Sequence, residues 1–216
     1  MTNTLVLDVD GTLVDTNYHH AVAWFRAFRR FDITVPTWRL HRAIGMGGDQ
    51  LVAAVAGDQV EREHGDELRQ AWEVAFEPML AEIRPLEGAH RLVAAALDQD
   101  FAVVLASSGK RHHVDHYLKL IDAPGVTSTS SDDVEHSKPA PDLIEVALRR
   151  VDRDGGRAVV IGDSVWDCRA AQRAGLPAVC LRTGGFGDAE LREAGASAVY
   201  EGLDELRAEL TDLPMA

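Results

Sequence analysis

The sequence predicts an α/β fold, in which a Rossmann-like, doubly wound parallel sheet carries an inserted α-helical segment. Three observations support this prediction: short apolar runs alternate with helical patterns, one long interval shows helical patterns only, and carboxylates directly follow two of the apolar runs. The chain has 216 residues, 46% of them hydrophobic, enough for the core of one domain plus a smaller insertion. With 22 basic and 35 acidic residues the net charge is −13, which disfavours nucleic-acid binding.

Short runs of apolar and β-branched residues recur along the chain, and each is too short to form a helix. Between most of them, apolar side chains stand three and four positions apart, as at Leu143, Val146 and Ala147. Strands that alternate with helices form parallel sheets, so we expect one parallel sheet covered by helices. The predicted strands are residues 4–7, 102–106, 126–129, 158–161, 178–181 and 198–200.

The interval from residue 15 to residue 84 shows no convincing strand, while helical patterns such as Ala21, Trp24 and Phe28 follow one another. A cluster of breakers at 85–88 marks the point where this insertion rejoins the sheet. We therefore expect an α/β core domain of residues 1–14 and 85–216, and an α-helical cap domain of residues 15–84. Two neighbouring hinge strands at 11–15 and 85–88 would suit a lid; a helical layer packed permanently on the sheet is the alternative.

The cysteines and the first residues indicate the cellular environment that we expect for the protein. Cys168 and Cys180 stand twelve positions apart without a CxxC motif, so we expect two packed thiols and neither a disulfide framework nor a zinc site. The first residues have no basic region, and no stretch approaches the roughly 18 apolar residues of a membrane span. We expect a cytoplasmic monomer or small homo-oligomer with no membrane partner.

The first predicted strand ends in two carboxylates, Asp8 and Asp10, immediately before Gly11. Asp is poor in strands and unfavourable to bury, and parallel sheets place their ligand crevice at the carboxyl ends of the strands. A spacing of two puts both side chains on the same side of a regular strand. The pair indicates a metal site or a catalytic pair; a turn with an Asx-type hydrogen bond is the alternative.

A second strand runs into Asp163 and, four residues later, Asp167. If these meet Asp8 and Asp10, the four carboxylates repel one another unless a cation and a basic residue neutralise them. Hard oxygen ligands indicate magnesium as that cation. For Asp163 and Asp167 alone, capping of a helix N-terminus is the alternative.

Two further elements could hold phosphate. A third strand ends in Ser107, Ser108 and Gly109, which offer hydroxyl and backbone N–H groups before the next helix, although a serine there could equally cap that helix. Lys138 lies in a proline-stiffened loop, where it offers a positive charge or is an ordinary surface lysine. His112 and His116 are four residues apart, which is zinc-like spacing, but no third ligand accompanies them, so no metal is expected there.

Four motifs in this order resemble those of the haloacid dehalogenase superfamily: DVDGT at 8–12, Ser107, Lys138 within SKPAPD, and GDSVWD at 162–167. The resemblance covers essentially the whole chain and implies a Mg²⁺-dependent phosphatase that hydrolyses a small-molecule phosphate ester through an aspartyl-phosphate. It implies that Asp8 is the nucleophile and Asp10 the general acid and base. Dehalogenases of the superfamily lack the Asp10 carboxylate, which disfavours carbon–halogen chemistry.

The resemblance also implies the remaining roles. Ser107, Ser108 and Gly109 would bind the phosphoryl oxygens, and Lys138 would bridge Asp8 and the phosphate. Magnesium would be held by residues that include the Asp10 backbone carbonyl; the predicted metal group is Asp8, Asp10, Asp163 and Asp167.

The inserted helices are similar to the small helical cap of phosphoglycolate phosphatases and β-phosphoglucomutases, where cap residues choose the substrate. This similarity implies that His20 and Gly47 contact the substrate. Residues 44–49 lack the positive charges that flank this loop in the mutases, so hydrolysis ranks above sugar phosphomutase chemistry. A phospho-accepting signalling domain without turnover is a third reading, which the acid/base carboxylate of Asp10 disfavours.

Overall fold

A computed structural model describes residues 2–151 and 156–216 of the chain. Its centre is a parallel sheet with the strand order β3-β2-β1-β4-β5-β6, so the strand that leads to Asp8 lies between those that lead to Ser107 and Asp163. The predicted strands are confirmed, with ends that shift by one or two residues. They are β1 (Thr4–Leu7), β2 (Ala102–Ala106), β3 (Thr127–Thr129), β4 (Ala158–Gly162), β5 (Ala178–Leu181) and β6 (Ala196–Tyr200).

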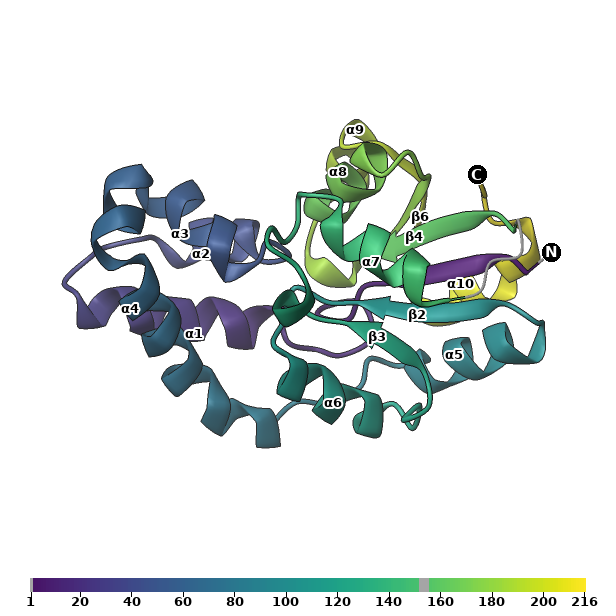
Figure 1. Cartoon of the computed structure of the whole chain (residues 1–216), viewed down its shortest axis with the longest axis horizontal. Helices are drawn as coiled ribbons and strands as arrows, with labels where there is room; N and C mark the ends of the chain where they lie inside the picture. Colours follow the sequence, from purple (N-terminus) through teal and green to yellow (C-terminus); the bar gives the residue numbers. More distant parts are fainter. Residues whose placement is uncertain (1, 152–155) are drawn as a thin grey trace.

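Helices cover both faces of the sheet, as expected for a doubly wound fold (Figure 1). Alternate side chains of β1 face opposite layers: Leu5 and Leu7 pack into one hydrophobic cluster, and Val6 packs into the other. The first layer contains α5 (Ala89–Asp98), α6 (Arg111–Leu120) and α10 (Leu203–Ala208). The second contains α7 (Asp142–Arg150), α8 (Val165–Arg173) and α9 (Asp188–Glu193). Short 3-10 turns are η2 (Ser131–Asp133), η3 (Arg182–Gly184) and η4 (Leu210–Asp212).

The interval that was predicted to be helical forms a separate group of helices beside the sheet, which we call the helical lobe (Figure 1). Its apolar positions, three and four apart, become buried ridges, and Trp24 stacks on Trp72 with ring centroids 5.6 Å apart. The lobe consists of α1 (Asn17–Arg30), α2 (Thr37–Ala43), α3 (Gly48–Ala56), α4 (Asp58–Phe76) and η1 (Glu77–Ala81).

The two segments that connect the lobe to the sheet lie side by side. Val14 and Pro85 form an antiparallel bridge. The Asp15 N–H donates to the Arg84 carbonyl at 3.0 Å, and the Leu86 N–H donates to the Leu13 carbonyl at 2.9 Å. The chain thus enters and leaves the lobe at one place, as the sequence predicts, while the division into a core domain and a cap domain stays a prediction.

Both cysteines are buried free thiols, as expected, with Sγ atoms 3.2 Å apart on α8 and β5. Within residues 2–151 and 156–216, no helix combines the length and the apolar character that crossing a membrane requires.

Candidate active site

The carboxyl ends of β1, β2 and β4 bring the predicted motifs to one edge of the sheet. Asp8, Ser107 and Asp163 follow these three adjacent strands, and each side chain is buried. Lys138, which arrives from the loop before α7, is only 1% exposed. A lysine is almost never buried without a partner, so its surroundings decide what it does.

Lys138 joins two carboxylates. Its Nζ forms a direct ion pair with Asp8 Oδ1, and it lies 2.8 Å from Asp167 Oδ1. The other oxygen of Asp8 accepts a hydrogen bond from Thr12 Oγ1 at 3.0 Å. Although burial favours the neutral amine, the charges of Asp167 and Asp8 hold the pKa of Lys138 above its ordinary value. The lysine therefore carries a fixed positive charge beside Asp8.

Asp163 and Asp167 occupy different surroundings. Asp163 Oδ2 accepts a hydrogen bond from Asn17 Nδ2 of the helical lobe at 2.7 Å. Asp167 Oδ2 accepts from the backbone N–H of Ser164 at 3.1 Å and from its hydroxyl at 2.6 Å, which forms a capping box at the start of α8. The capping alternative is therefore realised for Asp167, whose second oxygen nevertheless belongs to the charged cluster.

Three carboxylates and one lysine leave this buried cluster with excess negative charge. Asp8, Asp163 and Asp167 each place an oxygen within 4.8 Å of the others. Burial, followed by the charges of Asp167 and Asp10, raises the pKa of Asp8 to about 7, and burial next to Asp8 also raises the pKa of Asp163. A divalent cation would remove this repulsion, and the hard oxygen donors fit one such as Mg²⁺.

Asp10 is held separately from this cluster. Its Oδ1 accepts from Thr16 Oγ1 at 2.8 Å and lies 2.9 Å from His20 Nε2, while its Oδ2 accepts from Ser107 Oγ at 3.2 Å. Burial alone would raise the pKa of this carboxyl, but the charge of His20 and the hydrogen bonds from His20 and Thr16 hold it at about 2. The fixed carboxylate stands two residues beyond Asp8, at the floor of a pocket.

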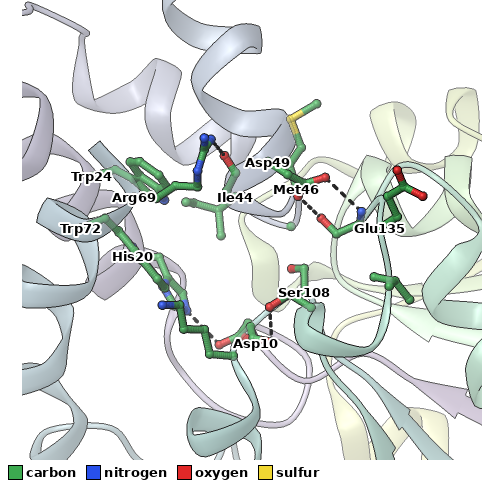
Figure 2. A pocket seen from close by; sticks show the side chains of 17 residues that line it. Asp10, His20, Trp24, Ile44, Met46, Asp49, Arg69, Trp72, Ser108 and Glu135 are labelled. Atoms are coloured by element: carbon green, nitrogen blue, oxygen red, sulfur yellow. Dashed lines mark hydrogen bonds and ion pairs between the residues drawn. The ribbon is translucent and has the colours of Figure 1, made fainter. Parts of the chain in front are cut away.

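The pocket is a cavity of about 210 Å³ between the sheet and the helical lobe. Figure 2 shows His20, Trp24, Arg69 and Trp72 along its lobe side, with Ser108 opposite them. Gly109, whose N–H donates to Ser107 Oγ at 2.9 Å, also lines it. The remaining lining residues are Asp10, Ile44, Gly45, Met46, Gly48, Asp49, Lys110, Ser131, Val134, Glu135 and Ser137.

Polar contacts close the lobe onto the sheet around this pocket. Asp49 accepts hydrogen bonds from the Ser137 hydroxyl at 2.5 Å and from its N–H at 3.1 Å. Lys110 Nζ lies 2.5 Å from Glu73 on α4 of the lobe. Gly47 lies against Ser137 so closely that a Cβ would overlap the Ser137 hydroxyl, and its neighbours line the pocket. A binding role for Gly47 stays a prediction.

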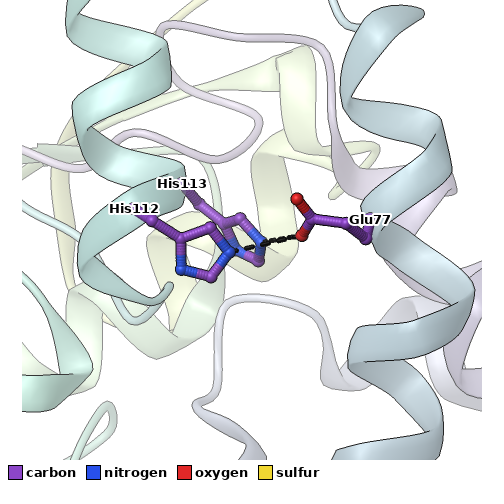
Figure 3. A group of neighbouring side chains, drawn as sticks. All are labelled: Glu77, His112 and His113. Atoms are coloured by element: carbon purple, nitrogen blue, oxygen red, sulfur yellow. Dashed lines mark hydrogen bonds and ion pairs between the residues drawn. The ribbon is translucent and has the colours of Figure 1, made fainter.

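A second contact between lobe and core involves two histidines of α6 (Figure 3). Glu77 Oε2 of the lobe lies 3.3 Å from His112 Nε2 and 3.5 Å from His113 Nε2. These ligand atoms are close enough to share an ion, whereas the pair singled out by its spacing was His112 with His116. Burial, followed by the charge of His112, lowers the pKa of His113 to about 4.

Several residues of the site escaped sequence reasoning. Thr12, Thr16 and Asn17 bind the key carboxylates, and their position directly after the first motif was the available signal. Arg69 stands three residues before Trp72 on α4, so helical spacing places both on one face. His20, predicted to contact substrate, lines the pocket and also contacts Asp10.

Comparison with known proteins fits this arrangement. The model of the family described as haloacid dehalogenase-like hydrolase matches residues 2–175. The chain belongs to this family. The matched residues include the helical lobe, so the likeness extends over the lobe as well as most of the sheet.

Two curated relatives and one solved structure illustrate the likeness. The fructose-1-phosphate phosphatase YqaB of Escherichia coli is 28% identical over 193 residues, which cover 82% of this chain and 95% of the relative. A phosphoglycolate phosphatase of Mesorhizobium japonicum is 27% identical over 218 residues, with 96% and 94% covered. The crystal structure of a hydrolase from Pseudomonas syringae superposes with a TM-score of 0.90 at 31% identity, with 99% of each chain covered.

Proposed function

We propose that this hydrolase is a Mg²⁺-dependent phosphatase that acts on a small-molecule phosphomonoester through an aspartyl-phosphate. The observation that carries the proposal is the buried Asp8–Lys138 ion pair, two residues along the chain from Asp10, which lines the pocket between the sheet and the helical lobe. An anionic nucleophile can approach an anionic phosphate only where positive charge offsets both. The phosphatases named among the relatives support the same chemistry.

In the first half of the reaction, an oxygen of Asp8 attacks phosphorus while the bond from phosphorus to the leaving alcohol breaks. Lys138 lies against Asp8 and offsets negative charge on the transferring group. Asp10 gives a proton to the leaving oxygen. With a pKa of about 2 in the free site, Asp10 must first take up that proton, which the dianionic phosphate beside it favours.

In the second half, Asp10 returns as a carboxylate and removes a proton from water, which attacks the aspartyl-phosphate and restores Asp8. Thr16, His20 and Ser107 hold the Asp10 carboxylate in one orientation for both halves. Ser107, Ser108 and Gly109 would bind the phosphoryl oxygens. In the free site the Gly109 N–H donates to Ser107 Oγ and the Ser107 hydroxyl donates to Asp10, so both groups exchange these partners for the phosphate.

Magnesium would be held by the side chains of Asp8 and Asp163 and the backbone carbonyl of Asp10, with Asp167 orienting Lys138. When bound it supplies positive charge to the phosphoryl oxygens and lowers the repulsion among these carboxylates. Closure of the lobe through Asp49 and Ser137 excludes bulk water from the pocket. In this proposal residues 15–84 act as the cap.

The pocket argues against the sugar phosphomutase alternative. A mutase must hold a second phosphate, yet among the described residues that line the pocket, Arg69 and Lys110 are paired with carboxylates of the lobe. A signalling domain is disfavoured because Asp10 stands ready as a base that would hydrolyse the phosphorylated Asp8. The cytoplasmic location and the oligomeric state expected from the sequence stay predictions.

The test is release of inorganic phosphate from para-nitrophenyl phosphate and a panel of small phosphomonoesters, with Mg²⁺ or with EDTA. We expect turnover that requires Mg²⁺ and falls by more than about 1,000-fold in Asp8→Asn. Asp98→Asn, an exposed carboxylate at the end of α5, is the matched control and keeps full activity. Interconversion of sugar phosphates without phosphate release indicates a mutase, and phosphorylated Asp8 without turnover indicates a signalling domain.

A further inference from the structure

The positive charges of the pocket are already used by the protein. Arg69 donates through Nη1 to Glu61 at 2.9 and 3.1 Å and to the Gly48 carbonyl at 3.1 Å, and through Nη2 to Asp66 at 2.8 Å. Lys110 forms its ion pair with Glu73. The charge of each cation is already offset by a carboxylate of the lobe, and that carboxylate repels an anionic group of a substrate that approaches the cation.

The negative charges around the pocket are not neutralised in the same way. Asp49 accepts its hydrogen bonds from Ser137 and from the side-chain amide of Gln50, all of them uncharged groups. Glu135 stands on the wall opposite the lobe and is exposed to solvent (Figure 2). These two carboxylates repel an anion that enters the pocket and attract hydroxyl or ammonium groups.

The lobe side of the pocket also carries an aromatic wall. The rings of Trp24 and Trp72 are stacked within 20° of parallel, and the ring of His20 continues the stack at 5.6 Å from Trp72. Because these rings stack on one another and are largely buried, they offer the cavity an apolar surface, which packs against the carbon atoms of a ligand. The wall therefore favours a ring or chain of carbons over a small, compact anion.

From these three observations, we propose that the pocket selects phosphate esters of uncharged polyols or amino-polyols and rejects esters that bear a carboxylate or a second phosphate. The cavity of about 210 Å³ has room for a leaving group of monosaccharide size. This inference rests on the proposed function for its kinetic readout, whereas its binding readout is independent of turnover.

The test compares esters that differ mainly in charge. The pairs are ethanolamine phosphate with phosphoglycolate, glycerol 3-phosphate with 3-phosphoglycerate, fructose 1-phosphate with fructose 1,6-bisphosphate, and glucosamine 6-phosphate with 6-phosphogluconate. Binding to the Asp8→Asn variant is measured by isothermal titration calorimetry with Mg²⁺ present, and kcat/KM is measured on the wild type. We expect the first member of each pair to bind at least about tenfold more tightly, a difference of about 1.4 kcal/mol.

A charge-removing variant identifies the source of the preference. We expect Glu135→Gln to reduce the ratio of the two dissociation constants in each pair of esters by about threefold, because it removes one repulsive carboxylate. The variant leaves the residues assigned to the reaction intact. Glu193→Gln, at an exposed position on α9 outside the pocket, is the matched control and leaves the ratios unchanged. Salt should also narrow the ratios, because it screens charges at the pocket rim.

The two proposals fail in different ways. Equal binding of both members of each pair, or tighter binding of the anionic member, overturns the charge selection whether or not phosphate is released. Discrimination in binding without phosphate release from any ester supports the charge selection and overturns the phosphatase proposal. If the ratios of dissociation constants stay unchanged in Glu135→Gln, the Glu135 carboxylate does not cause the preference, and the inference is wrong.

Discussion

The buried charges at the edge of the sheet and the lobe side of the pocket are built from different chemistry. At the sheet edge, Asp8, Lys138 and Asp167 are at most 5% exposed and form one chain of ion pairs. On the lobe side, stacked aromatic rings and a neutralised Arg69 face the cavity. The difference teaches that the reaction and the choice of substrate depend on different residues: buried charges fix the sheet edge, whereas Trp24, Arg69 and Trp72 line the cavity. Asn17 and His20 of the lobe belong with the sheet edge, because they bind Asp163 and Asp10.

The largest expected effect tests the sheet side at Asp10. Asp10→Asn removes the proton donor and acceptor, so we expect kcat for an alkyl phosphate to fall by about 10²–10⁴-fold. The loss should be smaller for formation of the aspartyl-phosphate from para-nitrophenyl phosphate, because that leaving group needs little help from an acid. Stopped-flow measurement of the para-nitrophenol burst checks this, and equal losses for both esters contradict the assigned role.

Gly47→Ala tests the contact between the helical lobe and the loop that carries Ser137. The backbone of Gly47 has a φ of −73°, which alanine adopts readily, so the effect is steric: the added Cβ overlaps the Ser137 hydroxyl. We expect kcat/KM to fall by up to about 100-fold because the lobe no longer seats on the sheet. Gly125→Ala, where a Cβ meets no atom within 4 Å, is the control. Unchanged kinetics in Gly47→Ala would show that closure tolerates displacement of this loop.

The third prediction concerns metal binding and pH. Because burial raises the pKa of Asp8 to about 7 and a metal binds only the carboxylate, Mg²⁺ must displace a proton below that pH. We expect the affinity for Mg²⁺ to fall by at least about tenfold per pH unit below pH 7, because Asp163, whose pKa burial also raises, can hold a second proton that the metal must displace. Calorimetry in buffers of different ionisation enthalpy measures the released proton. A flat affinity between pH 5.5 and pH 7 contradicts the raised pKa of Asp8.

The smallest expected effect is on the free energy of unfolding, at the contact of Glu77 in the lobe with His113 on α6. His113 has a pKa of about 4 in the folded protein against an ordinary 6.5, so the unfolded chain gains a proton that the folded chain does not. Stability is therefore lost as pH falls from 6.5 towards 4, by about 1.4 kcal/mol at pH 5.5.

His113→Asn should remove this part of the pH dependence whatever it does to absolute stability, and urea unfolding between pH 5 and pH 8 measures it. His90→Asn, an exposed histidine on α5, is the control and should keep the wild-type slope. If both variants lose stability with pH as the wild type does, His113 is not the titrating group.

The sequence predicts features that depend on local patterns of residues better than contacts between segments that lie far apart in the chain. The positions of the strands, the helical interval and the convergence of Asp8, Ser107 and Asp163 were confirmed, because the period of apolar residues and the carboxyl-end rule are local or topological. The ion pair of Lys138 with Asp167 was not predicted, because it joins two loops across the site.

The sequence by itself determined the fold class and the residues that meet at the carboxyl edge of the sheet. The reason is that strands alternating with helices form a parallel sheet, whose strands all end at the same edge. Only the tertiary structure decided which charged side chains of the pocket form ion pairs. Arg69 and Lys110 count as two cations in the sequence, yet Glu61, Asp66 and Glu73 neutralise them in the fold. Asp66 and Arg69 stand three residues apart on α4, a spacing that helical geometry favours, whereas Lys110 and Glu73 come from segments far apart in the chain. The physical reason is that a long-range pair depends on distances of a few ångströms, on which the pattern of residue types carries no information.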